Sequence, residues 1–308
     1  MASTSPCPST PLARAERFMW LTARVLEQRR FAHHFTGGGA EPVETALAAY
    51  RNEDGGYGHG LEPDLRGPLS RPSHASHALS VLDGVGRRGG PLVERVCRYL
   101  TLVSAADGAL PAAAPSAGAA GAPPQGELIT TGPVVGLLHR NQVWHAWLFR
   151  ATDFCWAAVN ALAKPHPYEV AAAVAFLDGV PDRVRAARAA DRLGRLVRER
   201  RMAVLDPGRP DAYPGADAYA AGGLSGDLPG GEHFFPHDYA RVPGSVARRW
   251  FTDEEMDGSL RFLARAQRED GGWPPDRPPW TPAASLERRP IATIEALRTL
   301  RAYGRDIG

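Results

Sequence analysis

Residues 263–274 read Leu263-Ala-Arg-Ala-Gln-Arg-Glu-Asp270-Gly-Gly-Trp273-Pro, and residues 47–58 read Leu47-Ala-Ala-Tyr-Arg-Asn-Glu-Asp54-Gly-Gly-Tyr57-Gly. Each copy is a helix-like stretch followed by Asp-Gly-Gly and an aromatic residue. A weaker third copy ends in Asp107-Gly108, 53 residues after Asp54. Because self-similar segments at a regular interval are the signature of a repeat architecture, we expect one structural unit used several times.

The spacing of the copies predicts how many units the chain holds. Asp270 lies 163 residues after Asp107, which is close to three further intervals of the same size. Degenerate copies are therefore expected near residues 160 and 215. Six units of this size fill the 308-residue chain.

Each unit has the pattern of a helical hairpin. Val43, Leu47 and Tyr50 recur at helical spacing before the first Asp-Gly-Gly. The paired glycines suit a helix end, because the left-handed conformation there costs glycine least. A second apolar stripe, which begins after Ser73, predicts the second helix.

The fold class predicted from these units is all-α. Leu-Ile-Thr-Thr at 128–131 is the one strand-like run, and Pro133 interrupts it. A period of 53 residues exceeds the roughly 33–47 residues of open helical solenoids. We therefore predict a closed α/α toroid of about six hairpins that forms a single domain over residues 1–308.

Two segments depart from the helical pattern. Residues 111–126 are rich in Ala, Pro, Gly and Ser, which predicts a flexible connection. Residues 205–245 combine many Gly and Pro with aromatic residues, whereas disordered linkers are poor in aromatics. We expect this long loop to form an ordered lid over the mouth of the toroid.

Composition narrows the cellular setting. The net charge of +2 gives no field that would attract nucleic acid or a membrane surface. No apolar run is long enough for a transmembrane helix, and no secretory signal is visible. The three widely spaced cysteines, Cys7, Cys97 and Cys155, are typical of free thiols in a reducing compartment. We predict a cytoplasmic protein, and the oligomeric state stays open.

The segment from Arg261 to Trp273 resembles the Gln-Trp repeat of squalene–hopene cyclases, oxidosqualene cyclases and their prenyltransferase relatives. In that family a Gln at the end of one helix packs on the Trp after the turn, and Gln267 and Trp273 match these positions. Residues 54–66 and 291–304 are also similar to small, uncharacterised bacterial prenyltransferase/squalene-oxidase-repeat proteins. The resemblance implies an α/α toroid and a small, hydrophobic, isoprenoid-derived substrate.

The chain also departs from that family. It has no Asp-x-Asp-Asp, the motif that supplies the proton in class II cyclases. The nearest match to the magnesium-binding Asp-Asp-x-x-Asp motif is Asp253-Glu-Glu-Met-Asp257. We interpret its acidic residues as the start of a helix, where they favour the helix dipole. None of the cysteines lies in the zinc-binding context of the protein prenyltransferases.

The first Asp-Gly-Gly turn carries an extra charged loop with His59, Glu62, Asp64 and Arg66. The loop is short and stiffened by proline. Asp64 or Glu62 would act as a general acid, and Arg66 would set the charge state of that carboxyl group. The alternative is a loop clamp, in which Arg66 pairs with Asp64 or Glu62. We favour a catalytic site for the group as a whole.

His74 and His77 lie three residues apart on the predicted helix that follows, so they are neighbours near the toroid mouth. They would act as a base or a proton relay. With His59 or Asp64 they would also suit a metal ion, so zinc or magnesium stays open as an alternative. The leading prediction includes no cofactor.

A second candidate group lies in the long loop, where His237 and Asp238 would form an acid–base unit. Glu287 is expected either to face the mouth or to pair with Arg288 or Arg289. The predicted substrate-binding residues are Tyr57, Phe234, Phe235, Trp280 and Glu287.

The leading functional hypothesis is a terpene-cyclase-like enzyme, a lyase or isomerase of secondary metabolism. It would act on an isoprenoid-derived small molecule by proton-initiated cyclisation or isomerisation. Two alternatives stay open. One is a carbohydrate-active toroid, a glycan hydrolase or lyase, and the other is a non-catalytic binding or scaffold protein.

Overall fold

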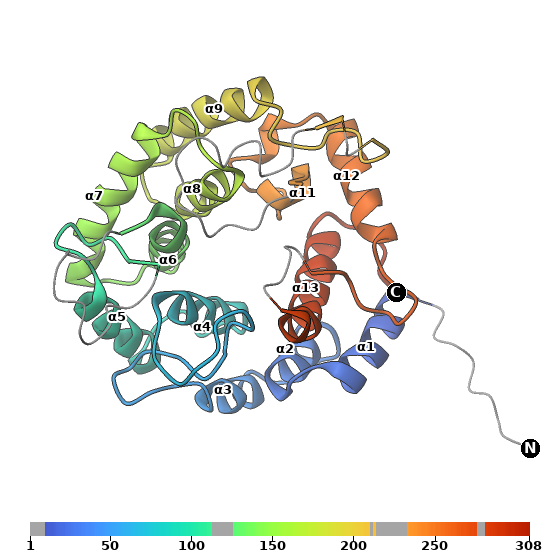
Figure 1. The fold of residues 1–308 in the computed structure, drawn as a ribbon, viewed down its shortest axis with the longest axis horizontal. Helices are drawn as coiled ribbons and strands as arrows, with labels where there is room; N and C mark the ends of the chain where they lie inside the picture. The colour runs from blue at the N-terminus through green and yellow to red at the C-terminus, as the bar shows by residue number, and fades with distance from the viewer. Residues whose placement is uncertain (1–9, 113–125, 210–211, 214–232, 276–280) are drawn as a thin grey trace, which may run out of the picture.

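The computed structural model describes residues 10–112, 126–209, 212–213, 233–275 and 281–308. Its helices alternate between an outer and an inner ring (Figure 1). The outer ring holds α1 (Pro11–Thr22), α3 (Glu41–Ala48), α5 (Pro91–Val103), α7 (Ala146–Ala161), α9 (Arg183–Glu199) and α12 (Asp253–Arg265). The inner ring holds α2 (Val25–Phe35), α4 (Pro72–Gly84), α6 (Leu128–Arg140), α8 (Pro167–Gly179), α11 (Pro236–Tyr239) and α13 (Pro282–Ala302).

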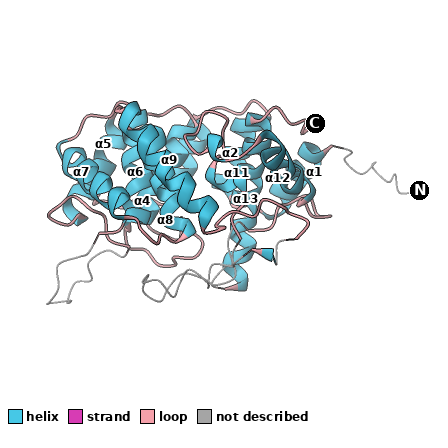
Figure 2. Cartoon of the chain, turned by 90° about the horizontal axis from the view of Figure 1, so that it is seen from above, coloured by secondary structure: helices cyan, strands magenta, loops and turns pink. Residues whose placement is uncertain are grey.

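The all-α toroid predicted from the repeat is confirmed. The twelve α-helices of the described ranges form six outer–inner pairs, and seen from above they run between the two rims of a flat ring (Figure 2). A short 3₁₀ turn, η2 (Arg248–Trp250), precedes α12. Extended pairing in these ranges is limited to an isolated bridge between Arg51 and Tyr57. The single-domain division stays a prediction.

The Asp-Gly-Gly turns join neighbouring hairpins. The glycine after the Asp of each turn has a positive φ: 86° at Gly55, 93° at Gly271, and 87° at Gly108 in the weaker copy Asp107-Gly-Ala. A Cβ atom at these glycines would lie 2.8 Å or less from backbone atoms of the next outer helix, in α5, α7 and α1 respectively. Only glycine allows both the backbone conformation and this close approach, so each turn docks against the following repeat.

The last turn closes the ring onto the first helix. Gln267 Nε2 donates to the carbonyl oxygens of Pro11 (2.8 Å) and Gly271 (2.9 Å), and Gln267 Oε1 accepts from Arg14 Nη2 (2.5 Å). Trp273 donates its indole N–H to Leu263 O (2.8 Å). The side chain of Gln267 therefore links the sixth repeat to the first.

Two inner helices approach each other closely through glycine. A Cβ atom at Gly136 of α6 would lie 2.1 Å from Ala175 O of α8, and one at Gly179 would lie 1.8 Å from Gly136 O. Helix backbones reach such distances only where no side chain separates them. The strand-like run at 128–131 begins α6, so helix packing decides its conformation.

The predicted grid of turns is only partly followed. The turn expected near residue 160 lies between the end of α7 at Ala161 and the start of α8 at Pro167. The turn expected near residue 215 comes earlier, because α9 ends at Glu199. Within the predicted lid, residues 236–239 form α11 in the inner ring, whereas residues 210–211 and 214–232 lie outside the described part of the chain. Most of the predicted connection, residues 113–125, also lies outside it.

No helix in the described ranges has the length and hydropathy needed to cross a bilayer. Cys97 and Cys155 are buried free thiols, and burial raises the pKa of Cys97 to about 11. The acidic run at 253–257 begins α12, where Thr252 and Glu255 form a capping box.

Candidate functional site

The charged loop is held at the rim where α4 and α13 begin. Its backbone passes through positive φ at His59 (56°) and Gly60 (71°). Arg24, at the start of α2, donates to the carbonyl oxygens of Gly60 (2.8 Å) and Leu61 (3.1 Å). Leu61 is fully buried and anchors the loop in the core, so the following carboxylates have fixed positions.

Glu62 and Asp64 meet side chains from two inner helices. Glu62 Oε1 lies 2.7 Å from His77 Nδ1 of α4, and Glu62 Oε2 lies 3.4 Å from Arg288 Nη1 of α13. The same Arg288 nitrogen lies 3.4 Å from Asp64 Oδ2. The Asp64 side chain is only 6% exposed, and those of His77 and Arg288 are each 8% exposed. We call Glu62, Asp64, His77 and Arg288 the rim cluster.

The contact between Glu62 and His77 orients the imidazole, with Nδ1 toward the carboxylate. An ionised carboxylate only accepts hydrogen bonds, so Nδ1 of His77 carries the hydrogen in this contact. Nε2 is the ring nitrogen that does not face Glu62. A carboxylate that orients an imidazole in this way is a recurrent acid–base arrangement in enzymes.

The prediction that Arg66 is the charge partner of Glu62 and Asp64 is wrong. Arg66 Nη2 pairs with Glu287 Oε1 (2.7 Å), and Arg24 Nη1 lies 3.8 Å from Glu287 Oε2. Arg288 holds the position beside Glu62 and Asp64 that the sequence analysis gave to Arg66. The spacing of residues 62–66 could not reveal this, because Arg288 lies 226 residues after Glu62 in the sequence.

His74 lies one helical turn before His77 and is 1% exposed. Burial lowers its pKa, and the nearby Glu62 and the Tyr57 backbone oppose that change only in part. The lowered pKa favours the neutral imidazole of His74, which lies nearer the start of α4 than His77 does. Tyr57 is 2% exposed and belongs to the hydrophobic core, whereas His59 is exposed and bonds Asn52 Oδ1 at 2.8 Å.

The second candidate group forms a separate packing unit. His237 Nδ1 lies 2.6 Å from Ser259 Oγ, and burial lowers the pKa of this imidazole. Asp238 Oδ2 accepts from the Phe235 backbone N–H (2.8 Å), and Asp238 Oδ1 lies 3.7 Å from His237 Nε2. Phe235 stacks on Phe262 with the ring centroids 4.5 Å apart.

Phe234 packs edge-on against Tyr168 of α8, with the ring centroids 5.0 Å apart. These contacts place the second group among α8, α11 and α12, whereas the charged loop contacts α2, α4 and α13. The structure therefore does not bring the two candidate groups together. Trp280 lies outside the described residues.

The described ranges contain no group of three or more His, Cys, Asp or Glu side chains arranged to hold a metal ion. His77, one of the histidines considered as a ligand, bonds Glu62.

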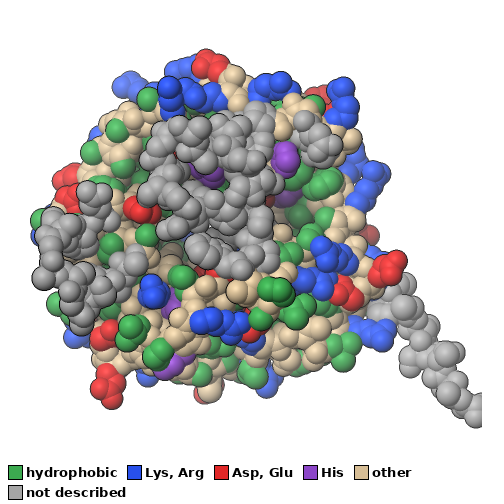
Figure 3. All heavy atoms as spheres, in the orientation of Figure 1, with side chains coloured by type: hydrophobic (Ala, Val, Ile, Leu, Met, Phe, Trp, Pro, Cys, Tyr) green, Lys and Arg blue, Asp and Glu red, His purple; other side chains and the backbone are tan. Residues whose placement is uncertain are grey.

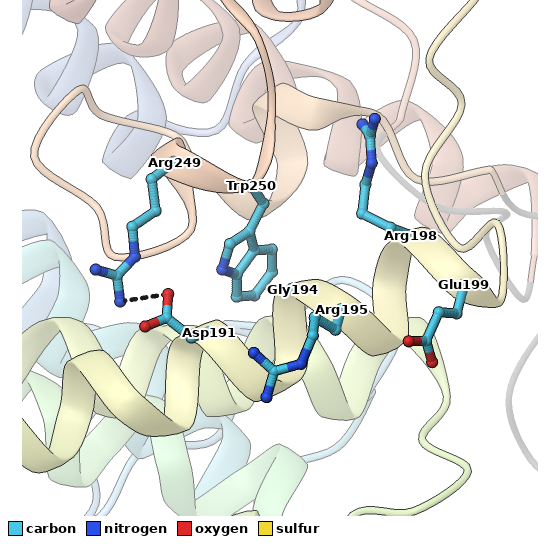
Figure 4. A pocket seen from close by; sticks show the side chains of 7 residues that line it. All are labelled: Asp191, Gly194, Arg195, Arg198, Glu199, Arg249 and Trp250. Carbon is cyan, nitrogen blue, oxygen red and sulfur yellow. Dashed lines mark ion pairs between the residues drawn. The ribbon is translucent and has the colours of Figure 1, made fainter.

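A surface pocket of about 440 Å³ lies between α9 and η2 (Figure 4). Its lining is charged, and Arg249 forms an ion pair with Asp191 (3.0 Å). Arg195 and Arg198 point in different directions (Figure 4). On the face shown in Figure 3, basic side chains gather along the edge formed by α9 and α12. None of the predicted site residues lines this pocket.

Comparison with known proteins finds similarity in three dimensions only. No protein-family model and no curated protein matches the sequence. The fold is similar to that of the type II terpene cyclase MstE from Scytonema, with a TM-score of 0.52 and 11% identity over 97% of this chain and 91% of that one. A complex of an MstE variant with merosterolic acid A, its product, gives a TM-score of 0.50 and 10% identity over 95% and 87% of the two chains.

A protein from Actinoplanes matches with a TM-score of 0.48 and 18% identity over 94% of this chain and 89% of that one. At such identities the similarity to MstE extends to the fold and no further. The chain has a terpene-cyclase-like α/α toroid fold.

Proposed function

We propose that the protein is an acid–base enzyme that acts on a hydrophobic, isoprenoid-derived small molecule, with the rim cluster as its catalytic site. The observation that carries the proposal is the convergence of Glu62, Asp64, His77 and Arg288 from a loop and two inner helices at one rim. The substrate class comes from the terpene-cyclase-like fold, since an MstE structure contains merosterolic acid A.

In the proposed reaction, Asp64 donates a proton and His77 accepts one. The Asp64 carboxyl group gives its proton to a carbon–carbon double bond of the substrate, which becomes a carbocation. Arg288, 3.4 Å away, compensates the carboxylate charge that is left. After cyclisation or isomerisation, Nε2 of His77 accepts a proton from the carbocation, and Glu62 holds the imidazolium. The proton returns to Asp64 through solvent, so the net reaction neither consumes nor releases one.

The test measures turnover of squalene, geranylgeraniol and farnesol, with products separated by gas chromatography and identified by mass spectrometry. We expect the purified protein to convert at least one of them. Asp64→Asn and His77→Gln should each lower the rate about 100-fold or more, as expected for loss of a general acid or base.

Arg66→Gln is the matched control, because it breaks a contact between the same loop and α13 without touching the carboxylates. It should leave turnover within a few-fold of wild type. If the rim cluster is only a structural clamp, Asp64→Asn should lower the melting temperature markedly and the wild-type protein should convert none of the substrates. That result would contradict the enzyme proposal and favour the binding or scaffold alternative.

The carbohydrate-active alternative gains no support from the rim cluster. Glu62 Oε2 and Asp64 Oδ2 both lie 3.4 Å from one nitrogen of Arg288. Both carboxylates are therefore engaged by one guanidinium group, whereas a glycosidase keeps its two carboxyl groups available to the sugar and to water.

A further inference from the structure

A second charged cluster lies along the inner helices, away from the rim cluster. Glu295 of α13 is surrounded by three arginines, one from each of three segments. Its Oε1 lies 3.2 Å from Arg30 Nη2 of α2 and 3.4 Å from Arg298 Nη1, and its Oε2 lies 3.9 Å from Arg241 Nη1, two residues after α11. We call Arg30, Arg241 and Arg298 the arginine cluster.

The arginine cluster and the rim cluster are separated along two helices. Glu295 and Arg298 follow Arg288 by seven and ten residues on α13, about 10–15 Å at the helical rise of 1.5 Å per residue. A Cβ atom at Gly84, the last residue of α4, would lie 4.0 Å from Arg298 Nη1, whereas His77 near the start of α4 belongs to the rim cluster. The arginine cluster therefore lies toward the opposite rim.

The positive charge of this cluster is only partly neutralised. Glu295 supplies one negative charge against three guanidinium groups. Other carboxylates on α2, α4 and α13 are engaged elsewhere: Glu27 bonds Arg24, Asp83 pairs with Arg88 and Arg140, and Glu287 pairs with Arg66. His34 beside the cluster is neutral, because burial first and then Arg298 and Arg30 lower its pKa to about 3.

Arg30 carries buried N–H groups for which the described residues supply no acceptor. It is 3% exposed, and its Nε and Nη1 atoms find no hydrogen-bond partner among the described residues. Buried N–H groups are normally paired, because leaving them without a partner is costly. Arg241 and Arg298 are partly exposed, with 50% and 35% of their side chains accessible, so the cluster is open to solvent on one side.

We propose that Arg30, Arg241 and Arg298 form a binding site for an oxyanion, the phosphate or carboxylate group of a ligand. Guanidinium groups present several N–H donors in a planar fork that matches both kinds of anion. Glu295 occupies the arginines in the unliganded protein and competes with the anion for them. The site is independent of the proposed acid–base chemistry, because it shares no residue with the rim cluster.

The experiment is calorimetric titration of the full chain at low ionic strength with inorganic phosphate in one series and acetate in another. Saturable binding of one anion per chain is expected. Tighter binding of phosphate would indicate a site for a tetrahedral oxyanion, and tighter binding of acetate a site for a planar one. Arg241→Gln and Arg298→Gln should each weaken binding about ten-fold or more, whereas Arg88→Gln, an exposed arginine on the α4–α5 connection, should not change it.

Glu295→Gln separates a binding site from a purely structural ion cluster. Removal of the competing carboxylate should tighten anion binding several-fold. Glu53→Gln removes the same charge at an exposed position outside the cluster and should leave the affinity unchanged. Equal affinities in wild type, Arg241→Gln and Arg298→Gln would overturn the proposal, as would the absence of saturable binding of both anions to the wild type.

Discussion

Four histidines with half-buried or buried side chains affect how the stability of the folded protein depends on pH. Burial lowers the pKa of His34, His74, His139 and His237 below the ordinary value for histidine. For His34 the neighbouring Arg298, Arg30 and His33 add to the effect, and Glu295 opposes it. These imidazoles are neutral in the folded protein at pH values where they are charged in the unfolded chain.

His34→Gln should reduce the pH dependence of stability. The His34 pKa is about 3 in the folded state and 6.5 in the unfolded state. Between these values the unfolded state binds more protons, so the contribution of neutral His34 is complete above pH 6.5 and declines as the pH falls toward 3. The variant should make the slope of unfolding free energy against pH shallower by at most about 1.4 kcal/mol per pH unit.

Urea denaturation at several pH values from 4 to 8 measures this slope. Parallel curves for wild type and His34→Gln over that interval would show that His34 does not titrate as expected.

At the scale of elements, close helix packing depends on particular glycines. Gly136→Ala would place a methyl group within 2.1 Å of Ala175 O, which is backbone and cannot move aside without shifting α8. Overpacking of this kind costs about 1–3 kcal/mol. We therefore expect a lower free energy of unfolding, measured by urea denaturation.

Gly258→Ala is the matched control for that substitution. Gly258 is also inside a helix, but its nearest neighbour would be the flexible end of Arg261 at 3.9 Å. Alanine should stabilise α12 there by about 0.5–1 kcal/mol, because it has the higher helix propensity. Equal losses of stability in the two variants would contradict the packing explanation.

The whole molecule is a ring whose last repeat must meet its first. Gln267→Ala removes three side-chain hydrogen bonds at this junction, to Pro11, Gly271 and Arg14. We expect a loss of about 1–3 kcal/mol in stability, because partners at the junction lose their hydrogen bonds. In native-state hydrogen exchange, the substitution should accelerate exchange relative to wild type more in α1 than in α6 or α8, since α1 is held by this junction.

Glu269→Ala in the same turn is the control, since this exposed side chain forms no ion pair with the described residues. Uniformly faster exchange across all helices in Gln267→Ala would show that the junction does not act locally on α1.

The parts of the site that were predictable are those carried by adjacent residues. The loop of residues 59–66 and the neighbouring histidines of α4 could be singled out because an insertion after a repeated turn and a three-residue spacing are both visible locally. Arg288 could not be assigned its place, since nothing near it in the sequence indicates Glu62 or Asp64. The arginine cluster could not be predicted either, because its members are far apart in the sequence: Arg30 lies in α2, Arg298 in α13, and Arg241 two residues after α11.

The sequence by itself determined the helices, the Asp-Gly-Gly turns and the closed ring. These features depend on local periodicity, on glycine's conformational freedom and on a repeat that must bury its apolar faces against its neighbours. The tertiary structure alone decided that α13 lies beside the charged loop of the second repeat, and that Arg288 rather than Arg66 faces its carboxylates. Closing the ring brings residues more than 200 positions apart within hydrogen-bonding distance, and side-chain packing in that ring then selects the partners.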